Sequence, residues 1–238
     1  MRTRRSQSGP FKEKVYYRDS DFEGICLDAL KASACLPASP SPVRIDRFVE
    51  KHFASLQFAD LGPNILGCTE FSAKGVSAIL ISSSLEEEPG KPAERRLRST
   101  IAHEAGHGLL HAHLFADLAA AQAQSQFADW TNPSKPRILC REIEGLSPSV
   151  RVSSYAGRWW EYQANRCIGS LLLPQKLFTE AIRPYGQMKG MLGTLVVPSD
   201  KRQVAAEGLA EVFDVNPAAV RIRMDQLFPE TQENQLSL

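Results

Sequence analysis

The sequence has 238 residues, of which 43% are hydrophobic and 23% are charged. These proportions are ordinary for a globular protein that buries a sizeable core. The formal net charge of +1 gives no general electrostatic reason to expect nucleic acid or an anionic membrane as a partner. No apolar run approaches the roughly 20 residues needed to cross a bilayer. No apolar segment follows the basic N-terminal residues either, so neither a membrane span nor a secretory signal is expected.

The cysteines are odd in number and scattered, and none forms a C-x-x-C pair. A disulfide framework and a cysteine-type zinc site are therefore not expected, whereas reduced thiols in a cytoplasmic protein are. The five positions are Cys26, Cys35, Cys68, Cys140 and Cys167.

The first segment, residues 1–18, is predicted to be a flexible basic arm. Residues 1–14 carry five basic side chains against the single acid Glu13, a composition typical of a solvated tail. Apolar residues then recur at helical spacing on either side of a proline-rich break, so two helices are predicted, over residues 19–36 and from residue 45 to about residue 53.

Three short apolar runs follow at residues 57–61, 65–71 and 76–82, separated by turn-forming residues. They are typical of a small antiparallel meander. A helix with Pro92 in its first turn is predicted next, and its apolar side is lined by Leu97, Ile101, Ala105 and Leu109.

Residues 116–157 are expected to be an insertion, with a strand at 137–141. A helix then begins near residue 158 and ends by residue 173, because Pro174 disfavours helical backbone in the residue before it. Two final helices, 202–213 and 217–227, are predicted with Asn216 as the N-cap of the second. They make residues 183–228 a helix-turn-helix-like segment, which a polar tail follows at 229–238.

The residues that point to chemistry are His103, Glu104 and His107. Two histidines four positions apart lie about one helical turn apart on the same face, so both imidazoles can reach one tetrahedral metal ion. Glu104 is the next residue round the helix, where its carboxylate can take a proton from water activated by the metal. This H-E-x-x-H pattern is typical of zinc hydrolases.

A catalytic zinc needs a third protein ligand. His113 has the spacing of an H-E-x-x-H-x-x-G-x-x-H site, but Leu110 stands where that pattern needs a helix-breaking Gly, so His113 is expected to point away. His111 lies eight residues, about 12 Å of helical rise, beyond His103, so it is not expected to complete the metal site either. The third candidate is Glu161, at the edge of the apolar face of the 158–173 helix; its other reading is an edge carboxylate paired with an arginine such as Arg158.

The chain contains two motifs together: H-E-A-G-H, and after it E-Y-Q-A-N-R-C-I-G-S-L-L-L-P. These two motifs carry a resemblance of the chain to the ImmA/IrrE metallopeptidases over roughly residues 45–228. The resulting fold class is α+β, mostly helical with a small antiparallel sheet. The resemblance implies a zincin-like metallopeptidase domain at 19–182 with one zinc ion per chain, held by His103, His107 and Glu161, and Glu104 as general base. It also implies a protein substrate, a DNA-bound helix-turn-helix repressor.

The sequence departs from the family pattern at three points. Gln163 replaces the second Glu of the motif, Cys167 and Ile168 replace an aromatic-Ala pair, and 54 positions separate His107 from Glu161. The last departure is the insertion described above. Residues expected to line the cleft or support the ligands are His111, Tyr155, Arg158, Tyr162 and Asn165, and all of these except Asn165 are candidate oxyanion donors.

Residues 201–238 hold four basic and six acidic side chains, whereas DNA binding favours a basic surface. The C-terminal helices are therefore interpreted as structural or repressor-docking, with Arg221 and Arg223 as the only candidate phosphate contacts. A rival hypothesis makes the chain a non-catalytic regulatory or sensor protein, in which the metal site is structural and the C-terminal helices or basic arm bind DNA or a transcription factor.

Overall fold

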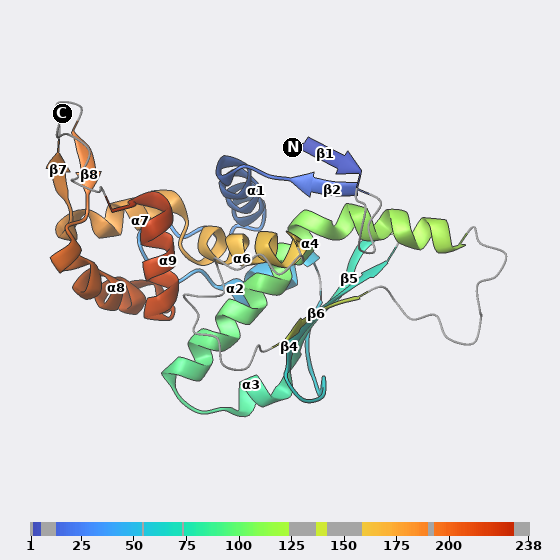
Figure 1. Cartoon of the computed structure of the whole chain (residues 1–238). Helices are drawn as coiled ribbons and strands as arrows, with labels where there is room; N and C mark the ends of the chain where they lie inside the picture. The colour runs from blue at the N-terminus through green and yellow to red at the C-terminus, as the bar shows by residue number, and fades with distance from the viewer. Residues whose placement is uncertain are drawn as a thin grey trace.

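One long helix, α4 (Lys91–Ala123), runs through the middle of the molecule (Figure 1). It packs against strands β4 (Ile65–Ser72) and β5 (Gly75–Ser82) and also against helix α6 (Trp159–Leu172). The computed structural model describes residues 2–5, 13–53, 55–72, 74–123, 137–141, 159–189 and 193–230. The fold is α+β and mostly helical, as predicted.

The main sheet is mixed, so the predicted antiparallel meander is wrong in one pairing. The strand order is β3 (Leu56–Ala59), β5 (Gly75–Ser82), β4 (Ile65–Ser72), β6 (Arg137–Arg141). β4 pairs antiparallel with β5 and β6, but β3 pairs parallel with β5. The eight-residue strands β4 and β5 form the long central ladder, which leaves the short, half-exposed β3 at the edge. The predicted strand at 137–141 is confirmed.

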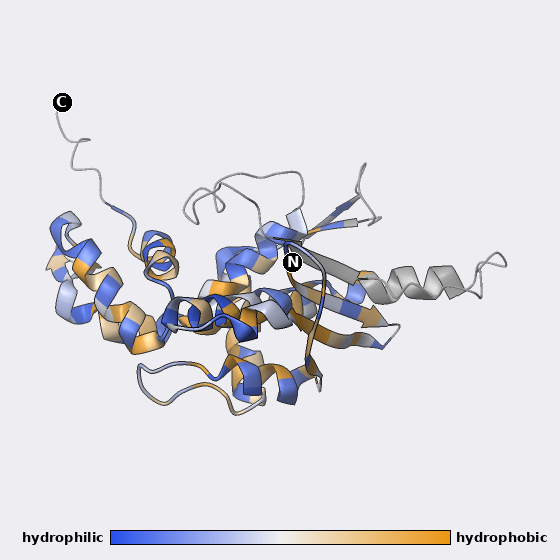
Figure 2. Cartoon of the chain, turned by 90° about the horizontal axis from the view of Figure 1, so that it is seen from below, coloured by the Kyte–Doolittle hydropathy of each residue, from blue (hydrophilic) through white to orange (hydrophobic). Residues whose placement is uncertain are grey.

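The two helices predicted before α4 are present as α1 (Asp19–Ala32) and α2 (Ile45–Phe53). The short α3 (Ser83–Glu87) was not predicted. α1 ends earlier than residue 36 because Ala34 takes a left-handed backbone conformation with φ 51°. Apolar residues alternate with hydrophilic ones along the helices (Figure 2), as burial of one face requires.

The N-terminal arm is not free over all of residues 1–18, so that prediction is wrong. β1 (Arg2–Arg5) and β2 (Glu13–Tyr16) form an antiparallel pair. Val15 is fully buried against a cluster that includes Phe71, Leu114 and Trp159. The basic composition of the arm gave no sign of these strands, because one apolar side chain directed inward is enough to attach a short strand.

The C-terminal part lies at the end of the molecule away from the main sheet (Figure 1). It contains α7 (Gln175–Ile182), the 3-10 turn η1 (Arg183–Tyr185), the hairpin β7 (Gln187–Lys189) and β8 (Thr194–Val196), and helices α8 (Ser199–Phe213) and α9 (Pro217–Leu227). The hairpin was not predicted. The two final helices are confirmed, and Asn216 caps α9 by accepting a hydrogen bond from the Ala218 N–H at 3.0 Å.

None of the helices in the described ranges combines the length and the apolar character that a membrane crossing needs. Four of the cysteines, Cys26, Cys35, Cys68 and Cys167, are free thiols. Cys140 lies on β6, and its side chain is outside the described part of the structure.

Candidate metal centre

His103, His107 and Glu161 come together as one cluster that could hold a metal ion. The Nε2 atoms of the two histidines are 3.0 Å apart. Glu161 Oε2 lies 3.3 Å from His103 Nε2 and 3.6 Å from His107 Nε2. The spacing on α4 therefore places both imidazoles as expected, and the third member comes from α6, 54 positions later.

The donor set fits a divalent metal of the zinc type. Two imidazole nitrogens and one carboxylate oxygen are ligands that zinc accepts, and they leave a fourth position open. Burial would by itself raise the pKa of Glu161, but hydrogen bonds with His103 and His107 outweigh it and hold the pKa below its usual range. Burial lowers the pKa of His107. An ionised Glu161 and a neutral His107 are the protonation states that metal binding requires.

The two helices approach closely enough for this cluster because of Gly106. A Cβ atom at that position would lie 2.9 Å from Cys167 Cβ and 3.0 Å from the Ala164 carbonyl oxygen. Any side chain at position 106 would therefore push α6 away from α4. Gly106 is therefore a point of close approach between the two helices.

Asn165 supports His103. The Nδ1 atom of His103 donates to Asn165 Oδ1 at 3.0 Å, which orients the ring so that Nε2 faces Glu161. This is the usual role of a ligand's neighbour, since the partner of one ring nitrogen determines which nitrogen is available to metal. Asn165 was predicted to lie near the site, and it does so.

Glu104 is fully buried beside the cluster. Thr69 donates its hydroxyl to Glu104 Oε2 at 2.5 Å, whereas Oε1 has no hydrogen-bond partner among the described residues. A Cβ at position 67 would lie 2.7 Å from Oε1, so the carboxylate needs Gly67 in β4. Burial raises the pKa of Glu104 to about 7. A carboxyl group with that pKa can both take and return a proton near neutral pH.

The remaining residues that the sequence placed at or near the site differ in their distance from the cluster. His113 is exposed and outside the cluster, as predicted from Leu110. His111 is fully buried, and its Nδ1 lies 3.1 Å from His107 Nδ1. Tyr162 is 41% exposed and lines a cleft that reaches His103. Tyr155 and Arg158 lie outside the described residues, and most of the expected insertion at 116–157 does so too.

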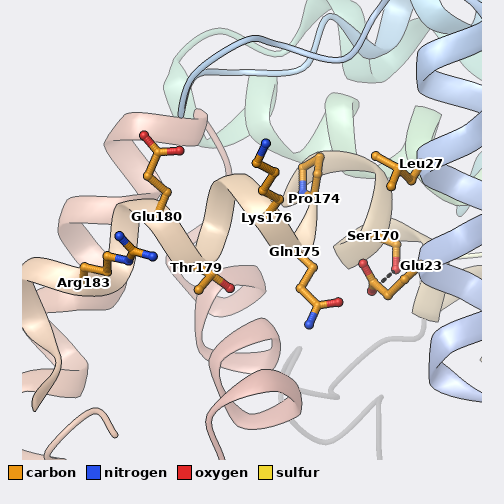
Figure 3. A pocket seen from close by; sticks show the side chains of 9 residues that line it. All are labelled: Glu23, Leu27, Ser170, Pro174, Gln175, Lys176, Thr179, Glu180 and Arg183. Atoms are coloured by element: carbon orange, nitrogen blue, oxygen red, sulfur yellow. Dashed lines mark hydrogen bonds between the residues drawn. The ribbon is translucent and has the colours of Figure 1, made fainter. Parts of the chain in front are cut away.

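The cleft that reaches His103 has a volume of about 510 Å³. α4 and α6 form two of its walls, and α9 forms another through Ala219, Ile222 and Gln226. A second cavity of about 540 Å³ opens elsewhere, between α1 and α7 (Figure 3). It contains no member of the His103–His107–Glu161 cluster, so the first cleft is the one that leads to the metal ligands.

The expectation for Arg223 is wrong. Its side chain is only 2% exposed and bonds to both carboxylate oxygens of Glu23 and to the Leu173 carbonyl oxygen, so it cannot contact a phosphate. Arg221 is exposed. Sequence reasoning missed this pairing because Glu23 and Arg223 are 200 positions apart, and no local spacing signals it.

Sequence reasoning also missed Thr69 and Val15 as neighbours of the site. Both lie on strands that are distant in sequence from α4.

Comparison with known proteins adds no identification: no family model matches this chain, and no curated protein matches it significantly.

Proposed function

We propose that this chain is a zinc-dependent endopeptidase of the cytoplasm, of the ImmA/IrrE type, that cleaves a regulatory protein such as a DNA-bound helix-turn-helix repressor. The observation that carries the proposal is Glu104. A site used only to hold a metal gains nothing from a fully buried carboxylate with one unpaired oxygen and a raised pKa. Hydrolysis needs such a group beside the metal.

The residues of the chain divide the reaction between them. A bound zinc ion would supply Lewis acidity, lowering the pKa of water to about 7 and polarising the scissile carbonyl. His103, His107 and Glu161 would hold the ion. Glu104 takes the proton of the attacking water on Oε1 and returns it to the leaving nitrogen. Thr69 keeps the carboxylate oriented by bonding to the other oxygen.

The cleft supports a polypeptide substrate rather than a small molecule. It opens to the surface beside Tyr162 and extends from His103 to α9. α9 is the second helix of the helix-turn-helix-like pair. Because it lines the cleft, the side of α9 that faces the cleft would contact the substrate. At the other end of the pair, Glu211 and Asp214 bind Arg95 of α4. Both contacts agree with a structural and docking role.

The test uses Glu104→Gln. The zinc-loaded full chain and this variant are each incubated with a peptide library derived from a whole proteome, and new termini are identified by mass spectrometry. We expect the wild type to cleave and the variant to lose at least a hundredfold in rate, while both retain one zinc per chain. Thr69 can still donate to the Gln oxygen, so the variant should fold.

The rival hypothesis, a non-catalytic sensor, predicts a different result. In that case the wild type and Glu104→Gln give the same peptide pattern, and the variant keeps any effect on a transcription factor. Equal patterns from the two metal-loaded proteins would exclude the hydrolase. A helix-turn-helix repressor encoded beside the gene is the first individual substrate to try.

A further inference from the structure

Behind His107, a series of buried polar groups leads to the N-terminal strand β2. His107 Nδ1 lies 3.1 Å from His111 Nδ1, and His111 Nε2 lies 3.0 Å from Gln163 Oε1. Gln163 Nε2 donates to the Val15 carbonyl oxygen at 2.7 Å. All of these side chains are at most 5% exposed, so water does not compete for their hydrogen bonds.

The direction of each hydrogen bond follows from the last one. A backbone carbonyl can only accept, so Gln163 must turn its NH₂ group to Val15 and its oxygen to His111. An amide oxygen also only accepts, so His111 carries its proton on Nε2. Because complete burial favours the neutral imidazole, His111 Nδ1 then holds a lone pair. It accepts from His107 Nδ1–H.

We propose that the Val15–Gln163–His111 network sets the tautomer of His107, so that its Nε2 presents a lone pair to the metal, and thereby makes β2 a part of the metal centre. His111 and Gln163 are positioning residues, because they contact His107 and the backbone of β2 and are not members of the metal-binding cluster. The ring of His111 is itself held by Trp159, whose ring centroid lies 5.7 Å away in an edge arrangement.

The network also explains why Gln suits position 163. The amide accepts from one neighbour and donates to another, whereas a carboxylate could not donate to the Val15 carbonyl. The proposal concerns metal binding, and it holds whether or not the chain hydrolyses peptides.

The direct test is the tautomer itself. Long-range ¹⁵N–¹H spectra of the zinc-loaded full-length chain distinguish Nδ1–H from Nε2–H imidazoles. We expect Nδ1–H for His107 and Nε2–H for His111. The reverse assignment for either residue would overturn the proposal, and this measurement needs no variant that might fail to fold.

The second test is zinc affinity, measured by competition with a chelator. His111→Phe keeps an aromatic ring but removes the acceptor, and it should weaken zinc binding roughly 10–100-fold. Gln163→Leu should act in the same direction. The matched control is His113→Phe on the same helix, where the side chain is exposed and no loss is expected. Wild-type affinity in His111→Phe would contradict the proposal.

Discussion

The two histidines of the metal cluster differ in what lies behind them. Behind His107 lies a closed, buried network that ends on the backbone of β2. His103 borders the open cleft, and its partner Asn165 also lines that cleft. One helix, α4, therefore carries a ligand on a closed side and a ligand on an open side, only one turn apart.

This difference separates two tasks. The closed side holds the ring of His107 in place and, in the proposed network, sets the tautomer with which it would bind metal. The open side is the cleft, which residues of α9 also line, and it would give a substrate access to His103. Changes on the closed side should therefore alter metal affinity, and changes on the open side should alter turnover of substrate while metal stays bound.

The largest expected effect comes from Glu161→Ala, which removes the ligand joining the two sides. Two histidines alone do not complete a catalytic zinc site. Zinc content after dialysis should fall from one per chain to near zero, a greater loss than for His111→Phe. His113→Ala should keep full zinc content, and the opposite ranking of these two variants would return the third-ligand role to His113.

The next largest effect should be a loss of stability when the anchor of α9, which lines the open side, is removed. Arg223 anchors α9 to Glu23 of α1, and it is only 2% exposed. Glu23→Gln leaves this buried cation without its counter-charge, which costs about 3 kcal/mol of unfolding free energy. Urea unfolding measures it. Glu50→Gln, at an exposed position of α2, should change stability by less than about 0.5 kcal/mol.

The cluster itself was predictable from sequence, because helical periodicity places His103 and His107 with no knowledge of the rest of the fold. Glu161 followed from the edge of an apolar stripe together with a family resemblance. The contacts of Val15, Thr69 and Arg223 were not predictable. Each joins segments whose proximity depends on how helices and strands pack, and no local pattern encodes that.

The fold shows the same limit. Helix ends were predicted well at Pro174 and Asn216, where local backbone chemistry decides. The parallel pairing of β3 was not predicted, because strand order depends on which ladder is longest. The strand β2 was missed for a related reason, since Val15 is a single apolar residue among charged ones.

Ile222→Glu tests the open side with a smaller expected effect. Ile222 lines the cleft from α9, and losing one apolar contact with substrate costs about 1.5 kcal/mol. For a peptide that the wild type cleaves, kcat/KM should fall about tenfold while zinc content stays at one per chain. Val212→Glu is the matched control, because Val212 is 40% exposed on α8 and does not line the cleft. Equal losses in both variants would remove α9 from the substrate path.

The smallest expected effect is the pH dependence of the Glu23–Arg223 pair. Burial by itself would raise the pKa of Glu23, but the hydrogen bonds and charge of Arg223 outweigh it and lower the pKa from 4.5. A depressed folded-state pKa contributes stability that is present above pH 4.5 and is lost as pH falls through the lower, folded value. The difference in unfolding free energy between wild type and Glu23→Gln should therefore shrink below pH 4.5. A difference that stays constant down to pH 3 would show that the pair does not titrate with unfolding, and the anchoring of α9 would then depend on packing rather than charge.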